Sequence, residues 1–138
     1  MATLDQLTDQ ALTIAERLIS DESFHEAVAA RYAAADVILS DRTGKGAPPI
    51  TSGYRPLWKQ RELYRRWTAG DPGVIVRPAR TSWHTEGRAI DVDRRHQNFD
   101  LFVAVWEALG GRWGGRFSKP DPVHFDVPGS SPPRPAYE

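Results

Sequence analysis

The stretch SWHTEGRAIDVD, residues 82–93, decides the fold of this sequence. Its second half, from residue 89 onward, alternates apolar and acidic residues, and a period of two predicts a β-strand with its apolar side chains on one face. Asp91 then lies on the polar face of that strand. His84 lies just before the strand, and Gly87 gives the chain the freedom to fold His84 back toward Asp91.

A second alternating stretch, Val123–Val127 (VHFDV), predicts the last strand of the chain. Phe125 then faces the core, and His124 and Asp126 face the other way. If the two strands pair, Asp91 and His124 project from the same face of the sheet. Two imidazoles and one carboxylate, from His84, His124 and Asp91, are therefore predicted to converge.

This set of side chains suits zinc. The chain contains no cysteine, so a metal would be held by His, Asp or Glu. Three protein ligands leave the fourth tetrahedral position open for water, which is typical of a catalytic zinc site. Any one of these residues alone is more often an ordinary surface residue, but the combination predicts Zn2+ bound by His84, Asp91 and His124.

A hydrolytic site also needs a base that does not bind the metal. Asp121 precedes His124 by three residues, and Pro122 restricts the backbone between them, so the Asp121 carboxylate is expected near the open side of the metal. Arg55 is the candidate for holding an oxyanion or a substrate carboxylate. Asp126 is a candidate for orienting a ligand through a hydrogen bond.

Ser82 and Trp83, next to His84, are candidates for substrate binding. Trp83 is expected either to wall the cleft or to lie in the core. Ser82 is expected either to bond with the substrate or a ligand, or to shape the turn. His96 is expected to be an exposed loop residue. Trp58, Trp67, Trp106 and Trp113 are assigned to the core.

The N-terminal segment, residues 1–41, shows apolar residues at helical spacing. We predict two scaffold helices there, the second capped by Ser20 or Asp21. His25 lies beside the second apolar stripe with no ligand motif around it, so a surface or packed histidine is expected. A loop rich in turn formers follows at residues 41–49.

The rest of the chain alternates short strands with helices and loops. A strand is predicted at Ile50–Ser52, a helix from Pro56 and another after the cap Asn98. The tail, residues 128–138, holds four prolines and is predicted to be loose. This order favours an α+β fold with a small, largely antiparallel sheet flanked by helices. A length of 138 residues fits one domain, 1–138, with its catalytic core at 50–127.

Charge is segregated along the chain although the formal net charge is zero. The basic residues gather in the middle of the sequence, which suits an anionic substrate or simply a solvated surface. The N-terminus is acidic and no apolar run is long enough to span a bilayer. We therefore expect synthesis in the cytoplasm without a signal peptide and no membrane span. A monomer is also expected.

The pattern S-x-H-x-x-G-x-A-x-D, which runs from Ser82 to Asp91, resembles the signature of the LAS metallopeptidases. This group includes D-Ala-D-Ala dipeptidases and carboxypeptidases, phage L-alanoyl-D-glutamate endopeptidases and the Hedgehog signalling domain. The segment from Asp121 to His124 is similar to the group's second motif, and SGYRP, residues 52–56, is similar to its arginine-bearing segment. RWGGRF, residues 112–117, resembles the phage endolysin branch. The resemblance covers roughly residues 50–127.

The resemblance implies a zinc peptidase that acts on peptidoglycan stem peptides at the cell wall. Because no signal peptide is expected, a phage lysis enzyme released by a separate pore-forming protein is the natural setting, with a bacterial wall-remodelling enzyme as the alternative. It implies His84, Asp91 and His124 as ligands, Asp121 as the base and Arg55 as the oxyanion stabiliser. The D-Ala-D-Ala enzymes usually carry glutamate where this chain has Asp121, which favours an endopeptidase of the endolysin type. The alternatives are a D-Ala-D-Ala carboxypeptidase and a non-catalytic, zinc-stabilised binding domain. A nucleic-acid partner is not expected, because no recognisable motif supports one.

Overall fold

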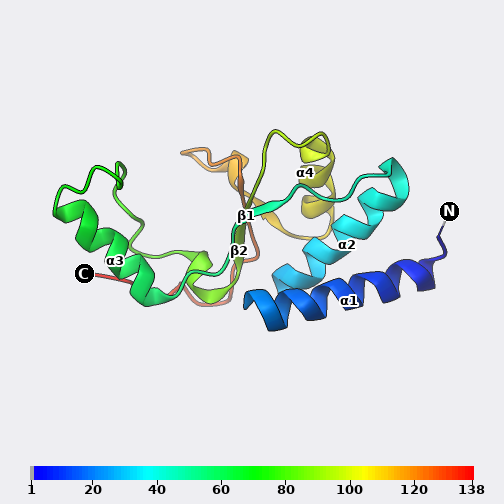
Figure 1. The fold of residues 1–138 in the computed structure, drawn as a ribbon, viewed down its shortest axis with the longest axis horizontal. Helices are drawn as coiled ribbons and strands as arrows, with labels where there is room; N and C mark the ends of the chain where they lie inside the picture. The colour runs from blue at the N-terminus through cyan, green and yellow to red at the C-terminus, as the bar shows by residue number, and fades with distance from the viewer. Residues whose placement is uncertain (1) are drawn as a thin grey trace.

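The computed structural model describes residues 2–138 and shows an α+β fold, which confirms the predicted fold class (Figure 1). A four-stranded antiparallel sheet has the strand order β1-β2-β4-β3. No helix of residues 2–138 has both the length and the apolar character needed to cross a bilayer. The elements in chain order are α1 (Leu4–Glu22), α2 (Glu26–Thr43), β1 (Ile50–Ser52), α3 (Leu57–Thr68), the 3-10 helix η1 (Trp83–Glu86), β2 (Ala89–Val92), α4 (Phe99–Ala108), β3 (Arg112–Trp113), the 3-10 helix η2 (Gly114–Arg116) and β4 (His124–Asp126).

The inner strands β2 and β4 pair in the register that the alternating sequences predict. Ile90 lies opposite Phe125, and Asp91 lies opposite His124. Because directly opposed residues of an antiparallel pair point to the same side, the apolar pair and the polar pair occupy opposite faces of the sheet. The pairing therefore separates the core from the site.

The core lies between the apolar face of the sheet and the helices α2 and α4. Ile90 and Phe125 are fully buried there, together with Phe102 and Trp106 of α4. The rings of Phe102 and Phe125 meet edge to face with centroids 4.8 Å apart, a favoured aromatic geometry. Figure 1 shows α1, α2 and α4 on one side of β1 and β2, and α3 with the C-terminus on the other. The polar face of the sheet thus looks toward α3.

The prediction that Ser20 or Asp21 caps the second helix is wrong. Helix α1 continues through both residues to Glu22, and its C-cap is Ser23, which has a left-handed conformation with φ of 57°. The N-cap of α2 is His25, whose Nδ1 accepts a hydrogen bond from the Ala27 amide at 3.0 Å. Its Nε2 lies 2.9 Å from Arg88 Nη2. His25 is therefore a packed structural histidine, and α2 extends to Thr43, into the predicted loop.

The tail is not loose, contrary to the prediction from its proline content. The amide of Ala136 donates to the Arg80 carbonyl at 2.8 Å, and Arg61 Nε donates to the Ala136 carbonyl at 2.9 Å. The ring of Tyr137 stacks on Tyr64 of α3 with centroids 3.6 Å apart. The residues after the last proline supply a backbone donor, carbonyl acceptors and an aromatic ring, and these dock the end of the chain on α3.

Of the four tryptophans assigned to the core, Trp106 is fully buried and Trp58 is 66% exposed. The assignment of Trp58 is wrong because α3 contributes no residue to the hydrophobic core, and its one fully buried residue is Gln60. Trp67 and Trp113 are half-buried. Asn98 does occupy the N-cap position of α4, but its amide bonds with the loop after α2 instead of with the helix.

Candidate metal centre

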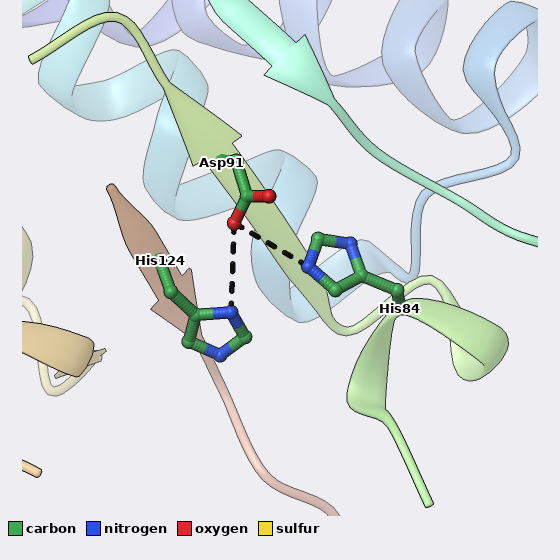
Figure 2. Close-up of side chains that lie close together, drawn as sticks. All are labelled: His84, Asp91 and His124. Atoms are coloured by element: carbon green, nitrogen blue, oxygen red, sulfur yellow. Dashed lines mark ion pairs between the residues drawn. The ribbon is translucent and has the colours of Figure 1, made fainter. Parts of the chain in front are cut away.

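The structure brings the three predicted ligands together on the polar face of the sheet (Figure 2). Asp91 comes from β2, His124 from β4 and His84 from η1, which immediately precedes β2. His84 Nε2 lies 3.4 Å from Asp91 Oδ1, and His124 Nδ1 lies 3.6 Å from the same oxygen. One ligand atom from each residue lies within 4.8 Å of the others.

The arrangement fits a zinc ion. In a tetrahedral site with bonds of about 2.0–2.1 Å, neighbouring ligand atoms are about 3.3–3.4 Å apart. The two nitrogen–oxygen distances are close to that spacing and too long for good hydrogen bonds. Asp91 Oδ1 is buried and has no hydrogen-bond partner among residues 2–138. A buried carboxylate oxygen without a donor is costly, and a cation bound there would satisfy it.

Electrostatics at Asp91 favour the form that binds metal. Burial alone would raise the pKa of the Asp91 carboxyl group, but the His124 and His84 imidazoles outweigh that effect and hold the pKa well below the ordinary aspartate value. Asp91 is therefore a carboxylate at neutral pH, as a metal ligand must be.

The turn that presents His84 depends on Ser82 and Gly87. Ser82 Oγ accepts a hydrogen bond from the His84 amide at 3.2 Å and so caps η1. Gly87 ends η1 in a left-handed conformation with φ of 68°. A Cβ atom there would lie 2.6 Å from the Ser23 carbonyl oxygen, so only glycine fits. Ser82 thus has the turn-shaping role, one of the two predicted for it.

Each imidazole is oriented by a bond to its second nitrogen. His84 Nδ1 donates to the Gly53 carbonyl at 2.8 Å, which leaves Nε2 with a free lone pair. His124 Nε2 lies 2.6 Å from Asp126 Oδ2, which leaves Nδ1 facing Asp91. Hydrogen bonds of this kind fix the tautomer and ring orientation of metal-binding histidines. The predicted orienting role of Asp126 agrees with this contact.

Asp126 is itself held by Arg112, a residue that the sequence interpretation missed. Arg112 Nε and Nη2 donate to the two carboxylate oxygens at 2.7 and 2.8 Å, and Asp126 is fully buried. Burial would raise the pKa of Asp126, but the bonds with Arg112 and His124 hold it below its ordinary value. The chain Arg112–Asp126–His124 is thus a charged network that ends at the metal site.

The three candidate ligands open into a cavity of about 480 Å³. Four other predicted site residues, Asp121, Arg55, Ser82 and Trp83, line the same cavity. The candidate base Asp121 has an exposed side chain, and its backbone is tied to Gly114, whose carbonyl accepts from the Asp121 amide at 2.9 Å. The Asp121 side chain is thus free to meet a substrate, while its backbone position is fixed.

Arg55 reaches the cavity on a short connection after β1. Its amide donates to the His84 carbonyl at 2.9 Å, which ties it to η1. Its Nη1 donates to Gln60 Oε1 at 2.9 Å, and Gln60 Nε2 donates to the Ala79 carbonyl at 2.8 Å. The buried Gln60 therefore positions Arg55. Gln60 was not predicted, because a polar residue on an otherwise polar helix carries no signal of burial.

Comparison with known families agrees with this site. Residues 76–127 match the family model described as D-alanyl-D-alanine carboxypeptidase. The matched segment contains His84, Asp91, Asp121 and His124 but not Arg55, and it covers less than half of the chain. No curated protein matches the chain.

The α+β fold, the His-Asp-His cluster and the match together support a peptidase of the LAS superfamily. The described substrate of the matched family supports peptidoglycan as the material on which such a peptidase acts.

Proposed function

We propose that the chain is a zinc-dependent peptidase that cuts an amide bond of the peptidoglycan stem peptide. The first candidate is the bond between L-alanine and D-glutamate, as in phage endolysins. The observation that carries the proposal is the unpartnered oxygen Asp91 Oδ1 facing one nitrogen of His84 and one of His124. The second nitrogen of each ring is already hydrogen-bonded, so the free nitrogens face a common point.

A zinc ion held by His84, Asp91 and His124 would supply Lewis acidity and lower the pKa of a coordinated water. The Asp121 carboxylate accepts a proton from the attacking water and then gives it to the leaving amine. The guanidinium of Arg55 donates hydrogen bonds to the carbonyl oxygen as negative charge develops on it. Gln60 keeps the Arg55 side chain aimed into the cavity during this step.

A second candidate, cleavage of the D-Ala-D-Ala bond, is favoured by the description of the matched family. The aspartate at position 121 favours the endopeptidase. The D-Ala-D-Ala enzymes usually carry glutamate there, which is longer by one methylene, whereas aspartate is seen in the endolysin branch that this chain resembles. Both reactions use the same residues. Mass spectrometry of purified sacculi after digestion distinguishes them, since one releases a peptide beginning at D-glutamate and the other releases D-alanine.

In either case the substrate is the cell wall, so we further propose that the protein works outside the cytoplasm. Release through the pore of a separate lysis protein fits the endolysin assignment. Wall lysis by cells that express this chain with and without a pore-forming partner tests that route. Lysis that does not depend on the partner would argue for another exit.

The decisive test combines metal removal with Asp121→Ala. Wall cleavage should stop on chelation and return with zinc. Asp121→Ala should retain stoichiometric zinc and lose about 100- to 10,000-fold in kcat, the range for removal of a general base. Asp9→Ala, which removes an exposed acid from α1, should behave as wild type. Full activity of Asp121→Ala would refute the mechanism, and zinc binding without any cleaved product would indicate a binding domain.

A further inference from the structure

Arg77 is an arginine of the cavity that the mechanism above does not use. It lines the same cavity as His84, Asp91 and His124. Within residues 2–138, no carboxylate lies within ion-pair distance of its guanidinium, whereas Arg66 and Arg80 have Asp71 and Glu138 as partners. The cavity therefore contains a cation that the folded chain does not neutralise.

Aromatic rings hold the Arg77 guanidinium in place. Its Cζ lies 5.8 Å from the ring centroid of Trp67 and 5.8 Å from that of Tyr137, within the range of cation–π contacts. Tyr64 joins these two rings into an aromatic cluster, since its centroid lies 6.0 Å from Trp67 and 3.6 Å from Tyr137. Trp67 and Tyr64 come from α3, whereas Tyr137 comes from the C-terminal tail. The docked tail thus completes the contacts of Arg77.

The segment that carries Arg77 is fixed to the catalytic part of the cavity. Gln60 donates to the Ala79 carbonyl and accepts from Arg55, so one buried side chain links the segment at Arg77 to the candidate oxyanion stabiliser. The hydroxyl of Tyr137 also donates to the Pro78 carbonyl. These bonds hold the backbone on the C-terminal side of Arg77 in place.

This environment suits recognition of a carboxylate. Rings that contact a guanidinium through cation–π interactions leave its N–H groups available for hydrogen bonds. A carboxylate can then accept two parallel bonds in the plane of the guanidinium. Of the other arginines of the cavity, Arg112 binds Asp126. Arg55, which donates to Gln60, is the candidate for holding the oxyanion.

We propose that Arg77, held on the aromatic cluster of Tyr64, Trp67 and Tyr137, forms a subsite that binds a carboxylate of the substrate. This inference rests on the proposed function, which supplies a stem peptide, and the lysine-containing form of that peptide carries two such groups. One is the α-carboxylate of γ-linked D-glutamate, and the other is the C-terminal carboxylate. The subsite makes binding depend on one of these charges, at a point separate from the bond that is cut.

The test measures binding of three synthetic peptides by calorimetry. They are L-Ala-γ-D-Glu-L-Lys-D-Ala-D-Ala, its amide at the D-glutamate α-carboxylate, and its amide at the C-terminus. The protein is the zinc-supplemented Asp121→Asn variant, in which turnover is blocked. It is compared with the same protein carrying Arg77→Gln or Arg94→Gln. Arg94 is exposed and does not line the cavity, so its substitution removes the same charge elsewhere.

We expect one of the two amides to bind about tenfold more weakly than the acid, a typical effect of losing one charge-assisted hydrogen-bonded contact. The amide that binds more weakly identifies the carboxylate that the subsite recognises. Arg77→Gln should bind the acid as weakly as that amide, and Arg94→Gln should keep the full difference. The inference is overturned if the Asp121→Asn protein binds all three peptides equally or binds none of them. It is also overturned if Arg77→Gln still binds the acid peptide more tightly than the weaker amide.

Cleavage of the unmodified peptide by the wild-type chain is measured separately. Absence of cleavage together with an Arg77-dependent preference for the acid would refute the proposed function and leave the subsite standing. Cleavage without any preference for the acid peptide would support the proposed function and refute the subsite.

Discussion

At the scale of single residues, His124 lies between two carboxylates. Burial would lower the pKa of its imidazole, but the hydrogen bond to Asp126 and the proximity of Asp91 raise the pKa to about 9. The metal-free protein therefore holds His124 as an imidazolium at neutral pH, with one proton on the nitrogen that faces Asp91. Zinc needs that lone pair, so binding must displace the proton.

This competition predicts how zinc affinity depends on pH. Because the raised pKa keeps the proton on His124 below about pH 9, the apparent affinity should rise about tenfold per pH unit up to that value and then level off. Near neutral pH, binding should release one proton from His124. Calorimetry in buffers of different ionisation enthalpy measures both quantities. An affinity that does not change between about pH 6 and about pH 8 would contradict the assignment.

Asp126 gives a second prediction at this scale. Asp126→Asn removes the negative charge that orients His124 and leaves Arg112 without its partner. At about pH 9 and above, where a proton on His124 no longer competes, zinc affinity should therefore fall about 10- to 100-fold. Competition with a chromophoric chelator measures the change. Asp93→Asn is the matched control, since Asp93 follows β2 and does not line the cavity. Equal zinc affinity in the two variants would show that the network does not support the metal.

At the scale of elements, the strict alternation of apolar and polar residues allowed the two central strands to be predicted from the sequence. The alternation around Asp91 and His124 predicts both the strands and their common face, and the observed register places these residues opposite each other. The strand β3 is only two residues long and carries no period. Arg112 lies on β3, so its bond to Asp126 depends on a pairing with β4 that the sequence does not signal.

The same limit explains the error about the tail. Proline content describes the tendency of an isolated segment, whereas the tail is held by groups far away in the sequence, on α3 and the segment before η1. The bonds of Ala136 with Arg61 and Arg80 join residues more than fifty positions apart. Contacts between segments so distant leave no local pattern in the sequence. The burial of Gln60 likewise left no pattern from which it could be predicted.

Removal of residues 132–138 tests the role of this docked element. The truncation deletes the backbone bonds of Ala136 and the ring of Tyr137, and we expect a loss of about 2–3 kcal/mol in the free energy of unfolding. Zinc affinity should not change, because none of His84, Asp91 and His124 is hydrogen-bonded to residues 132–138. Binding of the acid peptide should weaken as it does in Arg77→Gln. Denaturant titration and calorimetry measure these quantities, and Tyr137→Phe, which keeps the ring, should retain peptide binding.

At the scale of the whole molecule, the candidate ligands join segments that are distant in the chain. His84 lies on η1, which is hydrogen-bonded to the connection that carries Gly53 and Arg55, while Asp91 and His124 belong to the sheet above the core. A cation bound by all three residues would therefore connect the sheet to the α3 side of the molecule. Figure 1 shows α3 on the side of β1 and β2 opposite to α1, α2 and α4. Without it, the Asp91 oxygen that faces both imidazoles has no hydrogen-bond partner among residues 2–138.

Zinc should consequently stabilise the entire fold and not only the site. An ion that binds the native state alone adds about 4 kcal/mol when its free concentration is a thousand times its Kd. For a chain of this size, that corresponds to a rise in Tm of roughly 10–20 °C. Scanning calorimetry with zinc and with a chelator measures the difference. Asp91→Asn should abolish the zinc-dependent rise, because the amide cannot replace the anionic ligand, whereas Asp121→Ala should keep it. A rise that persists in Asp91→Asn would mean that zinc binds elsewhere, and a loss in Asp121→Ala would make Asp121 a ligand instead of the base.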